Sequence, residues 1–219
     1  MKRKIITTAD GSKTIQIEDW NEQYHSIHGA VQEAYHVFIK NGLNQFYNET
    51  VSILEIGFGT GLNALISLVE AKKQLLNVSY EGVEAYPVNL EEVRELNYIE
   101  TLNFQRYQKE FSLMHTSEWG KKITIASHFT LLKNQLDFKA INHQNLFNLI
   151  YFDAFGYRVQ PDLWSVQLFR KMFNALRVKG ILVTYAAKGS VRRAMQEVGF
   201  TVERLPGPPG KREMLRATK

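Results

Sequence analysis

The segment 52-SILEIGFGTGLN-63 decides the fold of this chain of 219 residues. The apolar run at 51–56 predicts a short buried β-strand, and the spacing of apolar residues predicts a helix over 62–75. Between them, Gly57, Gly59 and Gly61 stand at alternate positions. A strand, a glycine-rich turn and a helix in this order are typical of α/β folds that bind a ligand beyond the carboxyl ends of their strands. The segment therefore raises the question of which ligand the glycines serve.

Three ligands compete for this loop. A P-loop for nucleoside triphosphates needs a Lys-Ser or Lys-Thr pair at its end, and none follows here. A dinucleotide fold needs glycine at the sixth position of its motif, where this chain has Leu62. A class I S-adenosylmethionine site has an acid ahead of G-x-G-x-G, and Glu55 stands there. The Glu55 carboxylate would repel a pyrophosphate and attract an ammonium group, so the motif favours S-adenosylmethionine.

Further acids follow the other predicted strands. Glu84 follows the strand predicted over 78–83, where an acid accepts hydrogen bonds from ribose hydroxyls. Asp137 follows the strand predicted over 129–136 and is either a contact of the adenine amino group or a solvated turn residue. Asp153 ends the strand of "LFNLIYFD", which is apolar on both faces as a central parallel strand must be. Asp153 is therefore expected beside the glycine loop, where the reactive end of the cofactor would lie.

Composition excludes several classes of protein and site. The chain has no cysteine, so disulfides, thiolate metal ligands and cysteine nucleophiles are all excluded. Its basic N-terminus turns polar by Thr7 and lacks the apolar run of a secretory signal, and no segment reaches transmembrane length. His25, His28 and His36 do not form a His-Glu-x-x-His pattern, so we expect no metal site. We expect a cytoplasmic protein with no membrane partner.

Charge is distributed unevenly along the chain. The formal net charge is +5, but the segment from Arg170 onward holds 12 of the 27 Lys and Arg residues and 3 of the 22 Asp and Glu residues. That segment therefore carries +9 and the rest of the chain −4. Such an asymmetry is compatible with a surface for a polyanion such as nucleic acid, and equally with a solvated basic face.

Alternating strands and helices predict an α/β domain with a doubly wound, Rossmann-like sheet. We expect this domain over residues 46–219, preceded over residues 1–45 by a β-hairpin around Asp10-Gly11 and a first helix from Gly29 that stops at Asn41-Gly42. Residues 97–127 predict helices or an insertion. The remaining predicted elements are a helix at 87–96, a helix at 162–176, a fifth strand at 180–187, a helix at 190–198 and a closing hairpin of 201–205 with 214–217.

Four stretches of the chain resemble the methyltransferase domain of the MnmC family, which makes 5-methylaminomethyl-2-thiouridine at the wobble position of tRNA. The resemblance spans residues 24–217 and is weaker over 97–138. It rests on "YHSIHGAVQEAYHVFIKNGL", "EIGFGTGLN", "DAFGYRVQPDLW" with the following "LF", and "SVRRAMQEVGFTVERLPGPPGKREMLRA". It implies a class I methyltransferase fold, S-adenosylmethionine as methyl donor and the amine of 5-aminomethyl-uridine as acceptor.

The resemblance also implies roles for individual residues. Asp153 would face the transfer site and orient the attacking amine, while an aromatic residue, Phe155 or Trp164, would stack on the displaced wobble base or simply pack. Basic residues of the C-terminal segment would contact phosphates of the anticodon stem. The implied cofactor contacts are Glu55, Gly57, Gly59, Gly61, Glu84 and, closing over the cofactor, Glu33; the implied phosphate contacts are Lys188, Arg192, Arg193, Lys211 and Arg212.

Bifunctional relatives continue into a flavin-dependent oxidase domain, whereas this chain ends at Lys219. We therefore expect a separate flavin-dependent oxidase, or another route, to supply the free aminomethyl substrate. Two other functions remain open at this point. An aminopropyltransferase of the spermidine-synthase type would use the same fold and strand-ending acid but leaves the +9 segment unexplained. A noncatalytic RNA-binding module would explain the charge but not the glycines and acids.

Overall fold

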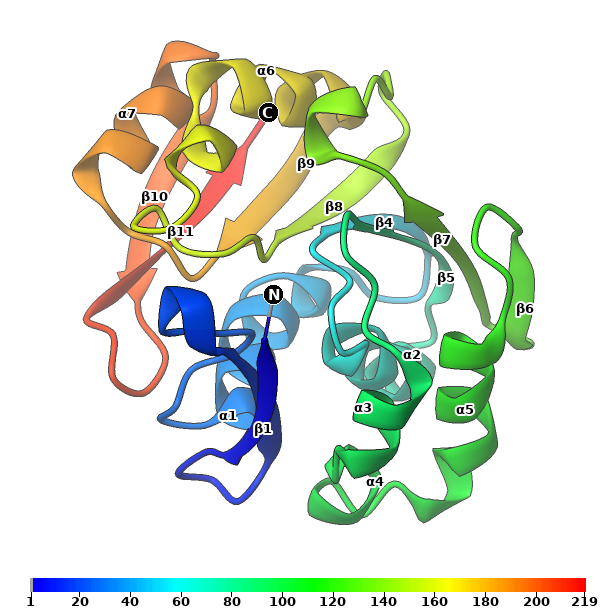
Figure 1. Cartoon of the computed structure of the whole chain (residues 1–219). Helices are drawn as coiled ribbons and strands as arrows, with labels where there is room; N and C mark the ends of the chain where they lie inside the picture. Colours follow the sequence, from blue (N-terminus) through cyan, green and yellow to red (C-terminus); the bar gives the residue numbers. More distant parts are fainter. Residues whose placement is uncertain (1) are drawn as a thin grey trace.

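The computed structural model describes residues 2–219, and within them a mixed eight-stranded sheet crosses the whole molecule (Figure 1). Its five middle strands run parallel, and the strands at both margins are antiparallel to their neighbours. In spatial order the strands are β10 (Thr201–Pro206), β11 (Glu213–Thr218), β9 (Leu176–Thr184), β8 (Phe147–Phe152), β4 (Thr50–Ile56), β5 (Asn77–Glu84), β7 (Phe129–Gln135) and β6 (Ile123–Ala126).

The strand order places a topological switch point between β4 and β8. From β4 the chain winds outward to β5 and β7, then returns to β8 on the other side of β4 and continues to β9. Ligands of such sheets bind at the carboxyl ends of the strands on either side of this point. The turn after β4 holds the three glycines, and Asp153 follows β8 directly. The fold thus brings together two motifs that lie more than ninety residues apart in sequence.

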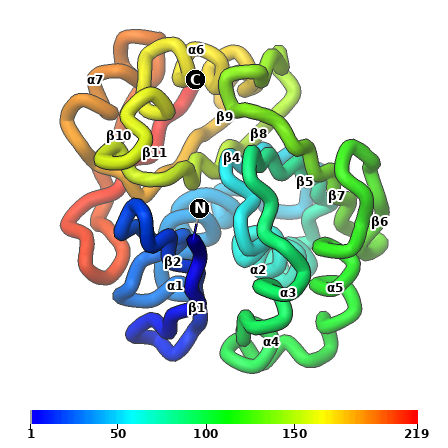
Figure 2. The backbone as a smooth tube through the Cα atoms, in the orientation of Figure 1, coloured from blue at the N-terminus to red at the C-terminus, as the bar shows by residue number. Residues whose placement is uncertain are grey.

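Helices cover both faces of the sheet, and each face has its own hydrophobic core (Figures 1 and 2). Aromatic and aliphatic side chains that are almost completely buried fill both layers, among them Phe38 and Tyr80 on one face and Phe152 and Phe169 on the other. The first face is covered by α1 (Ala30–Ala34) with the π-helical segment η2 (Tyr35–Lys40), α2 (Leu62–Lys73), α3 (Leu90–Glu95), α4 (Tyr98–Thr101) and α5 (Gln108–Thr116). The second face is covered by α6 (Val166–Ala175) and α7 (Gly189–Glu197). Short 3-10 turns, η1 and η3–η6, lie at Glu18–Trp20, Leu43–Gln45, Gln105–Tyr107, Phe138–Ala140 and Pro161–Trp164.

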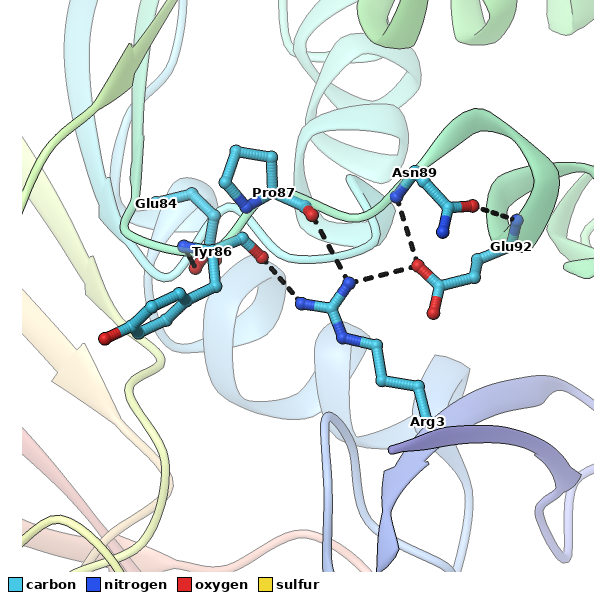
Figure 3. Close-up of polar contacts among 6 residues, drawn as sticks. All are labelled: Arg3, Glu84, Tyr86, Pro87, Asn89 and Glu92. Carbon is cyan, nitrogen blue, oxygen red and sulfur yellow. Dashed lines mark hydrogen bonds and ion pairs between the residues drawn. The ribbon is translucent and has the colours of Figure 1, made fainter. Parts of the chain in front are cut away.

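A separate antiparallel sheet of β1 (Arg3–Thr7), β2 (Lys13–Ile17) and β3 (Glu22–Gln23) precedes the large one. Figure 3 shows how Arg3 ties it to the loop after β5. The Arg3 guanidinium donates to the carbonyl oxygens of Tyr86 at 2.7 Å and Pro87 at 3.3 Å, and pairs with Glu92 at 3.0 Å. The N-terminal sheet is therefore fastened to the loop that follows Glu84.

Most of the predicted elements are present, and three details of the prediction were wrong. The helix predicted from residue 87 begins at Leu90, because Asn89 and Glu92 form a capping box that sets its start. The helix predicted over 162–176 is interrupted at Ser165, whose hydroxyl caps α6. The fifth strand begins at Leu176 rather than at 180 and ends at Thr184. The ambiguous stretch 97–127 forms α4, α5 and the marginal strand β6.

Candidate active site

A pocket of about 400 Å³ opens at the switch point of the sheet. Six segments form its wall: the glycine turn with the start of α2, the loops after β5, β7 and β8, Tyr185 after β9, and residues 23–25 of the N-terminal segment. Among the predicted residues, those that line the pocket are Gly57, Gly59, Glu84, Asp137, Asp153 and Phe155. Gly61, Glu33 and Glu55 lie outside its wall.

The glycine turn has a backbone that side chains would obstruct. Gly57, Gly59 and Gly61 have φ angles of 91°, 49° and 72°, in the left-handed region that favours glycine. A Cβ atom at residue 57 would lie 2.6 Å from the carbonyl oxygen of Asp153. The glycine at this position is therefore required for the close approach of the turn to the end of β8.

Glu84 fastens this turn to the loop after β5. Its carboxylate is buried and accepts a hydrogen bond from the Gly59 amide at 3.0 Å and another from the Tyr86 amide at 2.9 Å (Figure 3 shows the second). A carboxylate oxygen has two lone pairs, so both oxygens keep acceptor capacity toward the pocket. Glu84 can thus hold the loops and accept ligand hydroxyl groups at the same time.

Asn63 bridges two carboxyl groups at the floor of the pocket. Its amide nitrogen donates to Oε1 of Glu55 at 2.9 Å and to Oδ2 of Asp153 at 3.0 Å. Within residues 2–219, Oε2 of Glu55 and Oδ1 of Asn63 are buried and have no hydrogen-bond partner. Unpartnered buried acceptors are costly, and a ligand that donates hydrogen bonds, such as one with an ammonium group, would satisfy them. These unpartnered acceptors therefore fit a ligand with an ammonium group better than a pyrophosphate, which has no donor to offer them.

Two carboxyl groups of this floor have strongly raised pKa values. Burial raises the pKa of Glu55 well above its ordinary range, and the hydrogen bond from Asn63 only partly opposes this. Burial also raises the pKa of Asp153 to about 8; the charge of Glu33 adds to the rise, while Asn63 and Lys211 oppose it. A carboxyl group with a pKa near the working pH can both accept and release a proton. Asp153 is accordingly the residue suited to proton exchange with a ligand.

Aromatic rings form the other side of the pocket. Phe155 packs edge-on against Tyr24 at 5.0 Å and Trp20 at 5.6 Å between ring centres. The structure does not bring Trp164 to the pocket, because this residue is 2% exposed and packs against Phe152 in the core. The Trp164 indole donates to the Phe155 carbonyl at 2.9 Å and so holds the backbone of Phe155, a residue of the pocket wall, in place.

Several residues of the pocket were missed at the level of sequence. Asn63 stood within the glycine motif, but nothing in the motif indicates that its amide reaches Asp153. Tyr24 and His25 reach the pocket only because the N-terminal sheet folds back over it, and Tyr185 because β9 ends beside β8. Burial lowers the pKa of His25 to about 4, which leaves its ring neutral near neutral pH.

Three further predicted contact residues, Asp137, Glu33 and Lys211, also have partners within the protein. The carboxylate of Asp137 lines the pocket but accepts a hydrogen bond from the Lys139 amide at 2.7 Å, as the cap of a short turn. Glu33 is buried, accepts from the Ser26 amide at 2.8 Å and forms an ion pair with Lys211. Lys211, predicted to contact phosphate, is thus engaged inside the molecule.

The basic residues of the C-terminal segment divide between two edges of the sheet. Arg177 and Lys179 lie near the start of β9, opposite the pocket. The remaining predicted phosphate contacts lie on the pocket edge, where α7 and the β10–β11 loop begin. Of these, Lys188 stands 3.6 Å from the centre of the Tyr157 ring, Arg192 is half-buried, Arg193 is exposed, and the Arg212 side chain is 93% exposed.

The described residues contain no cluster of His, Cys, Asp or Glu able to hold a metal ion. None of the helices in residues 2–219 has the length and apolar character needed to cross a membrane.

Comparisons with known proteins agree on one family. A family described as S-adenosyl-L-methionine-dependent methyltransferase has a model that matches residues 94–219, more than half of the chain. The tRNA 5-methylaminomethyl-2-thiouridine biosynthesis bifunctional protein MnmC of Azoarcus sp. is 28% identical over 217 residues, which are 90% of this chain and 33% of that protein. The protein of the same name from Pseudoalteromonas translucida is 26% identical, over 91% of this chain and 34% of its own length. The chain therefore spans about a third of these curated relatives.

Solved structures show the same fold. MnmC2 from Aquifex aeolicus superposes with a TM-score of 0.77 at 26% identity, over 99% of this chain and 69% of that one. Spermidine synthase from Thermotoga maritima superposes with a TM-score of 0.54 at 13% identity, over 98% and 72%, a likeness of fold alone. These likenesses confirm the predicted Rossmann-like α/β fold of a class I methyltransferase.

Proposed function

The chain belongs to the S-adenosyl-L-methionine-dependent methyltransferase family, and from this premise we propose that it N-methylates 5-aminomethyl-(2-thio)uridine at the wobble position of tRNA, giving the 5-methylaminomethyl form. The observation that carries the proposal is the position of Asp153. Its carboxyl group has a pKa of about 8, lies at the switch point beside the glycine turn, and faces an aromatic wall. The likeness to MnmC2 over 99% of the chain supports the same acceptor.

The pocket divides into a cofactor side and an acceptor side. On the cofactor side, Gly57, Gly59 and Glu84 would contact the nucleoside, and Asn63, whose amide Glu55 holds from outside the pocket wall, would contact the amino-acid end. When bound, S-adenosylmethionine supplies a methyl group on a positively charged sulfur, which an amine nitrogen can take in one displacement. The residues of this side position the cofactor, and positioning is a large part of such catalysis.

On the acceptor side, Asp153 accepts a hydrogen bond from the amine and so orients its lone pair. Its raised pKa also suits it to take the amine proton. Phe155 offers a ring on which the flipped uracil base can stack, and its edge contacts with Tyr24 and Trp20 hold that ring in place. We also propose that residues 1–45 form an N-terminal unit ahead of the catalytic domain at 46–219, and that Trp20 and Tyr24 of this unit complete the acceptor side.

The anticodon stem-loop is the proposed polyanion for the pocket edge. Lys188, Arg192, Arg193 and Arg212 lie on this edge and can neutralise backbone phosphates, whereas Lys211 is occupied by Glu33. We also propose that the acceptor arrives as the free aminomethyl form, since attack needs an accessible nitrogen lone pair. A separate flavin-dependent oxidase or another route would then produce it, and we propose the cytoplasm as the location of the reaction.

The decisive experiment measures methyl transfer from labelled S-adenosylmethionine to tRNA that carries 5-aminomethyl-uridine at the wobble position. We expect label in that nucleoside with the wild type, loss of it in Asp153→Ala, and wild-type transfer in Glu118→Ala, a change on an exposed residue away from the pocket. Cofactor binding should survive in Asp153→Ala. Absence of transfer by folded, cofactor-bound wild type, together with turnover of a polyamine, would replace the proposal by the aminopropyltransferase function.

A further inference from the structure

The ammonium group of Lys211 lies next to the pocket but behind its wall. It comes from the loop between β10 and β11 and pairs with Glu33 of α1, a residue that is 5% exposed. The Lys211 nitrogen also stands 3.7 Å from the centre of the Tyr185 ring. Tyr185 lines the pocket, whereas Lys211 and Glu33 do not. The pair is thus a partly buried ion pair, with Glu33 buried and the Lys211 side chain 31% exposed, that the proposed contacts with cofactor and acceptor do not use.

Glu33 and Lys211 act on Asp153 in opposite directions. The charge of Glu33 raises the pKa of Asp153, and that of Lys211 lowers it. Together the two side chains form a neutral pair, and the effect of Lys211 offsets part of the effect of Glu33. If either one were missing, the other would act alone on any ionisable group beside Asp153.

Burial opposes the charged form of the other titratable groups that face this assembly. Glu55 and Tyr80 face Asp153 from β4 and β5, and Tyr185 faces it from the end of β9; burial raises the pKa of each of these three groups. His25 faces Glu33 and Lys211, and burial lowers its pKa to about 4. Glu33 and Lys211 are the two charged side chains that shift the pKa of Asp153.

The opposing charges of Glu33 and Lys211 affect the protonation of the acceptor amine. A primary amine is mostly an ammonium ion at neutral pH and has no lone pair for attack in that form. Two carboxylates beside it would stabilise the ammonium ion and raise its pKa further. We propose that Lys211 is a positioning residue that cancels the charge of Glu33, so that the acceptor amine meets one carboxylate, Asp153, instead of two. This inference rests on the proposed amine acceptor.

The step that Lys211 favours is a proton transfer. The N–H bond of the ammonium ion breaks and its electron pair stays on nitrogen, while the proton forms an O–H bond with the carboxylate of Asp153. An ammonium ion and a carboxylate become a neutral amine and a carboxylic acid, so charge is conserved. A neighbouring cation is a known means of making an amine nucleophilic, because it disfavours the charged form.

Two substitutions with opposite expected signs test the assignment. Lys211→Met leaves Glu33 uncompensated, and Glu33→Gln leaves Lys211 uncompensated. The first measurement is the pKa of Asp153 in the RNA-free protein, from the carboxyl carbon signal of labelled aspartate that disappears in Asp153→Asn. We expect it to rise by about one unit in Lys211→Met and to fall by about one unit in Glu33→Gln, the lower end of the range for a nearby charge.

The second measurement is the pH dependence of kcat for tRNA methylation, which reports ionisations in the bound complex. The acidic limb should move upward in Lys211→Met, by about one unit, with a loss of about tenfold in rate at pH values below the limb. It should move downward in Glu33→Gln and return toward the wild type in Lys211→Arg. Lys40→Met, an exposed lysine on η2, should leave the profile unchanged.

The outcomes separate this inference from the proposed function. An unchanged pKa of Asp153 in both variants, or a kcat profile that falls equally at every pH, would overturn the role of Lys211. A further outcome is that the two variants shift the Asp153 pKa in opposite directions while the wild type methylates no tRNA. This outcome would overturn the proposed acceptor but would still support the opposing effects of Glu33 and Lys211 on Asp153. Opposite shifts of the two variants in the Asp153 pKa and in the pH profile of kcat would support both the role of Lys211 and the proposed amine acceptor.

Discussion

The amide nitrogen of Asn63 lies 3.0 Å from Oδ2 of Asp153 and donates a hydrogen bond to it. The same nitrogen donates to Glu55 at 2.9 Å, so both of its hydrogens are used and the amide is held in one orientation. Because the hydrogen bond favours the ionised form, it lowers the pKa of Asp153 against the larger effect of burial. Asn63 thereby links the position of the reactive carboxyl group to its protonation.

Replacement of Asn63 by alanine should therefore reduce catalysis more than folding. We expect kcat/KM for methyl transfer to fall by about tenfold to a hundredfold, since a hydrogen bond to a charged group contributes about 1.5 to 3 kcal/mol. The pKa of Asp153 should rise further. Steady-state kinetics over a pH series would test this, with Asn134→Ala, whose amide binds Glu81 away from the pocket, as the matched control. Equal losses in the two variants would contradict the assignment.

Asp153 should reduce the stability of the ligand-free protein at high pH. Its pKa is about 8 in the folded chain and 3.8 in its ordinary state, so the folded form binds more protons between these values. The free energy of unfolding therefore falls as pH rises through this window and levels off above pH 8. The cost is absent at pH values below the ordinary pKa.

Asp153→Asn should remove this cost and abolish methyl transfer. We expect its advantage over the wild type in unfolding free energy to grow by at least about 1 kcal/mol between pH 5 and pH 8, since one pKa unit corresponds to about 1.4 kcal/mol. Chemical denaturation at both pH values would measure it. A constant difference between the proteins would show that Asp153 is ionised throughout.

The sequence was sufficient to predict the acids at the pocket edge. Glu84 and Asp153 each follow an apolar run, and parallel strands end at one edge of the sheet, so their positions follow from strand order alone. The glycine turn could be predicted for the same reason. Helix and strand ends were less accurate where a side chain set them, as Ser165 does for α6.

Side-chain directions could not be predicted in the same way. Lys211 counted as one of many basic residues near the C-terminus, but its partner Glu33 is 178 positions away in sequence. A charge count cannot distinguish an ammonium group that faces solvent from one that faces a buried carboxylate. Trp164 is a similar case, because an aromatic residue after Asp153 suits either the core or the pocket until its neighbours are known.

The exposed arginines on the pocket edge should contribute to RNA binding through phosphate contacts. We expect Arg193→Ala and Arg212→Ala each to weaken tRNA binding. Each should also make the dependence of the logarithm of the association constant on the logarithm of salt concentration less steep, by about 1 in slope. Arg177→Ala removes an exposed arginine at the opposite edge of the sheet and should change neither quantity. Binding isotherms at several salt concentrations would test this. An equal effect of Arg177→Ala would indicate nonspecific attraction by net charge.

Glu84 should control cofactor affinity. In Glu84→Gln one backbone amide of the pair Gly59 and Tyr86 loses its acceptor, because a glutamine side chain offers a single oxygen. We expect the Kd for S-adenosylmethionine to rise by about tenfold to a hundredfold, as the loss of a charged hydrogen bond implies. Calorimetry on Glu81→Gln, which changes an acid three residues earlier on β5, is the control. A Kd unchanged in Glu84→Gln would remove Glu84 from the cofactor contacts.

Arg3 should couple the N-terminal sheet to the cofactor side of the pocket. Its guanidinium binds the Tyr86 and Pro87 carbonyls and Glu92, and the Tyr86 amide binds Glu84 (Figure 3). Arg3→Met should therefore loosen both the N-terminal sheet and the Glu84 loop. We expect the unfolding free energy to fall by about 1 to 2 kcal/mol, since the guanidinium and the Glu92 carboxylate are both mostly buried.

Hydrogen exchange distinguishes this coupling from a purely local loss. Amides of β1 and β2 and the Tyr86 amide should exchange faster in Arg3→Met, and addition of S-adenosylmethionine should restore protection at both places. Lys2→Met removes an exposed neighbouring charge and should leave exchange at Tyr86 unchanged. If Arg3→Met loosens β1 and β2 but leaves Tyr86 protected, the N-terminal sheet packs against the pocket without influencing the Glu84 loop. Faster exchange at both places would make residues 2–23 part of the apparatus that holds the cofactor.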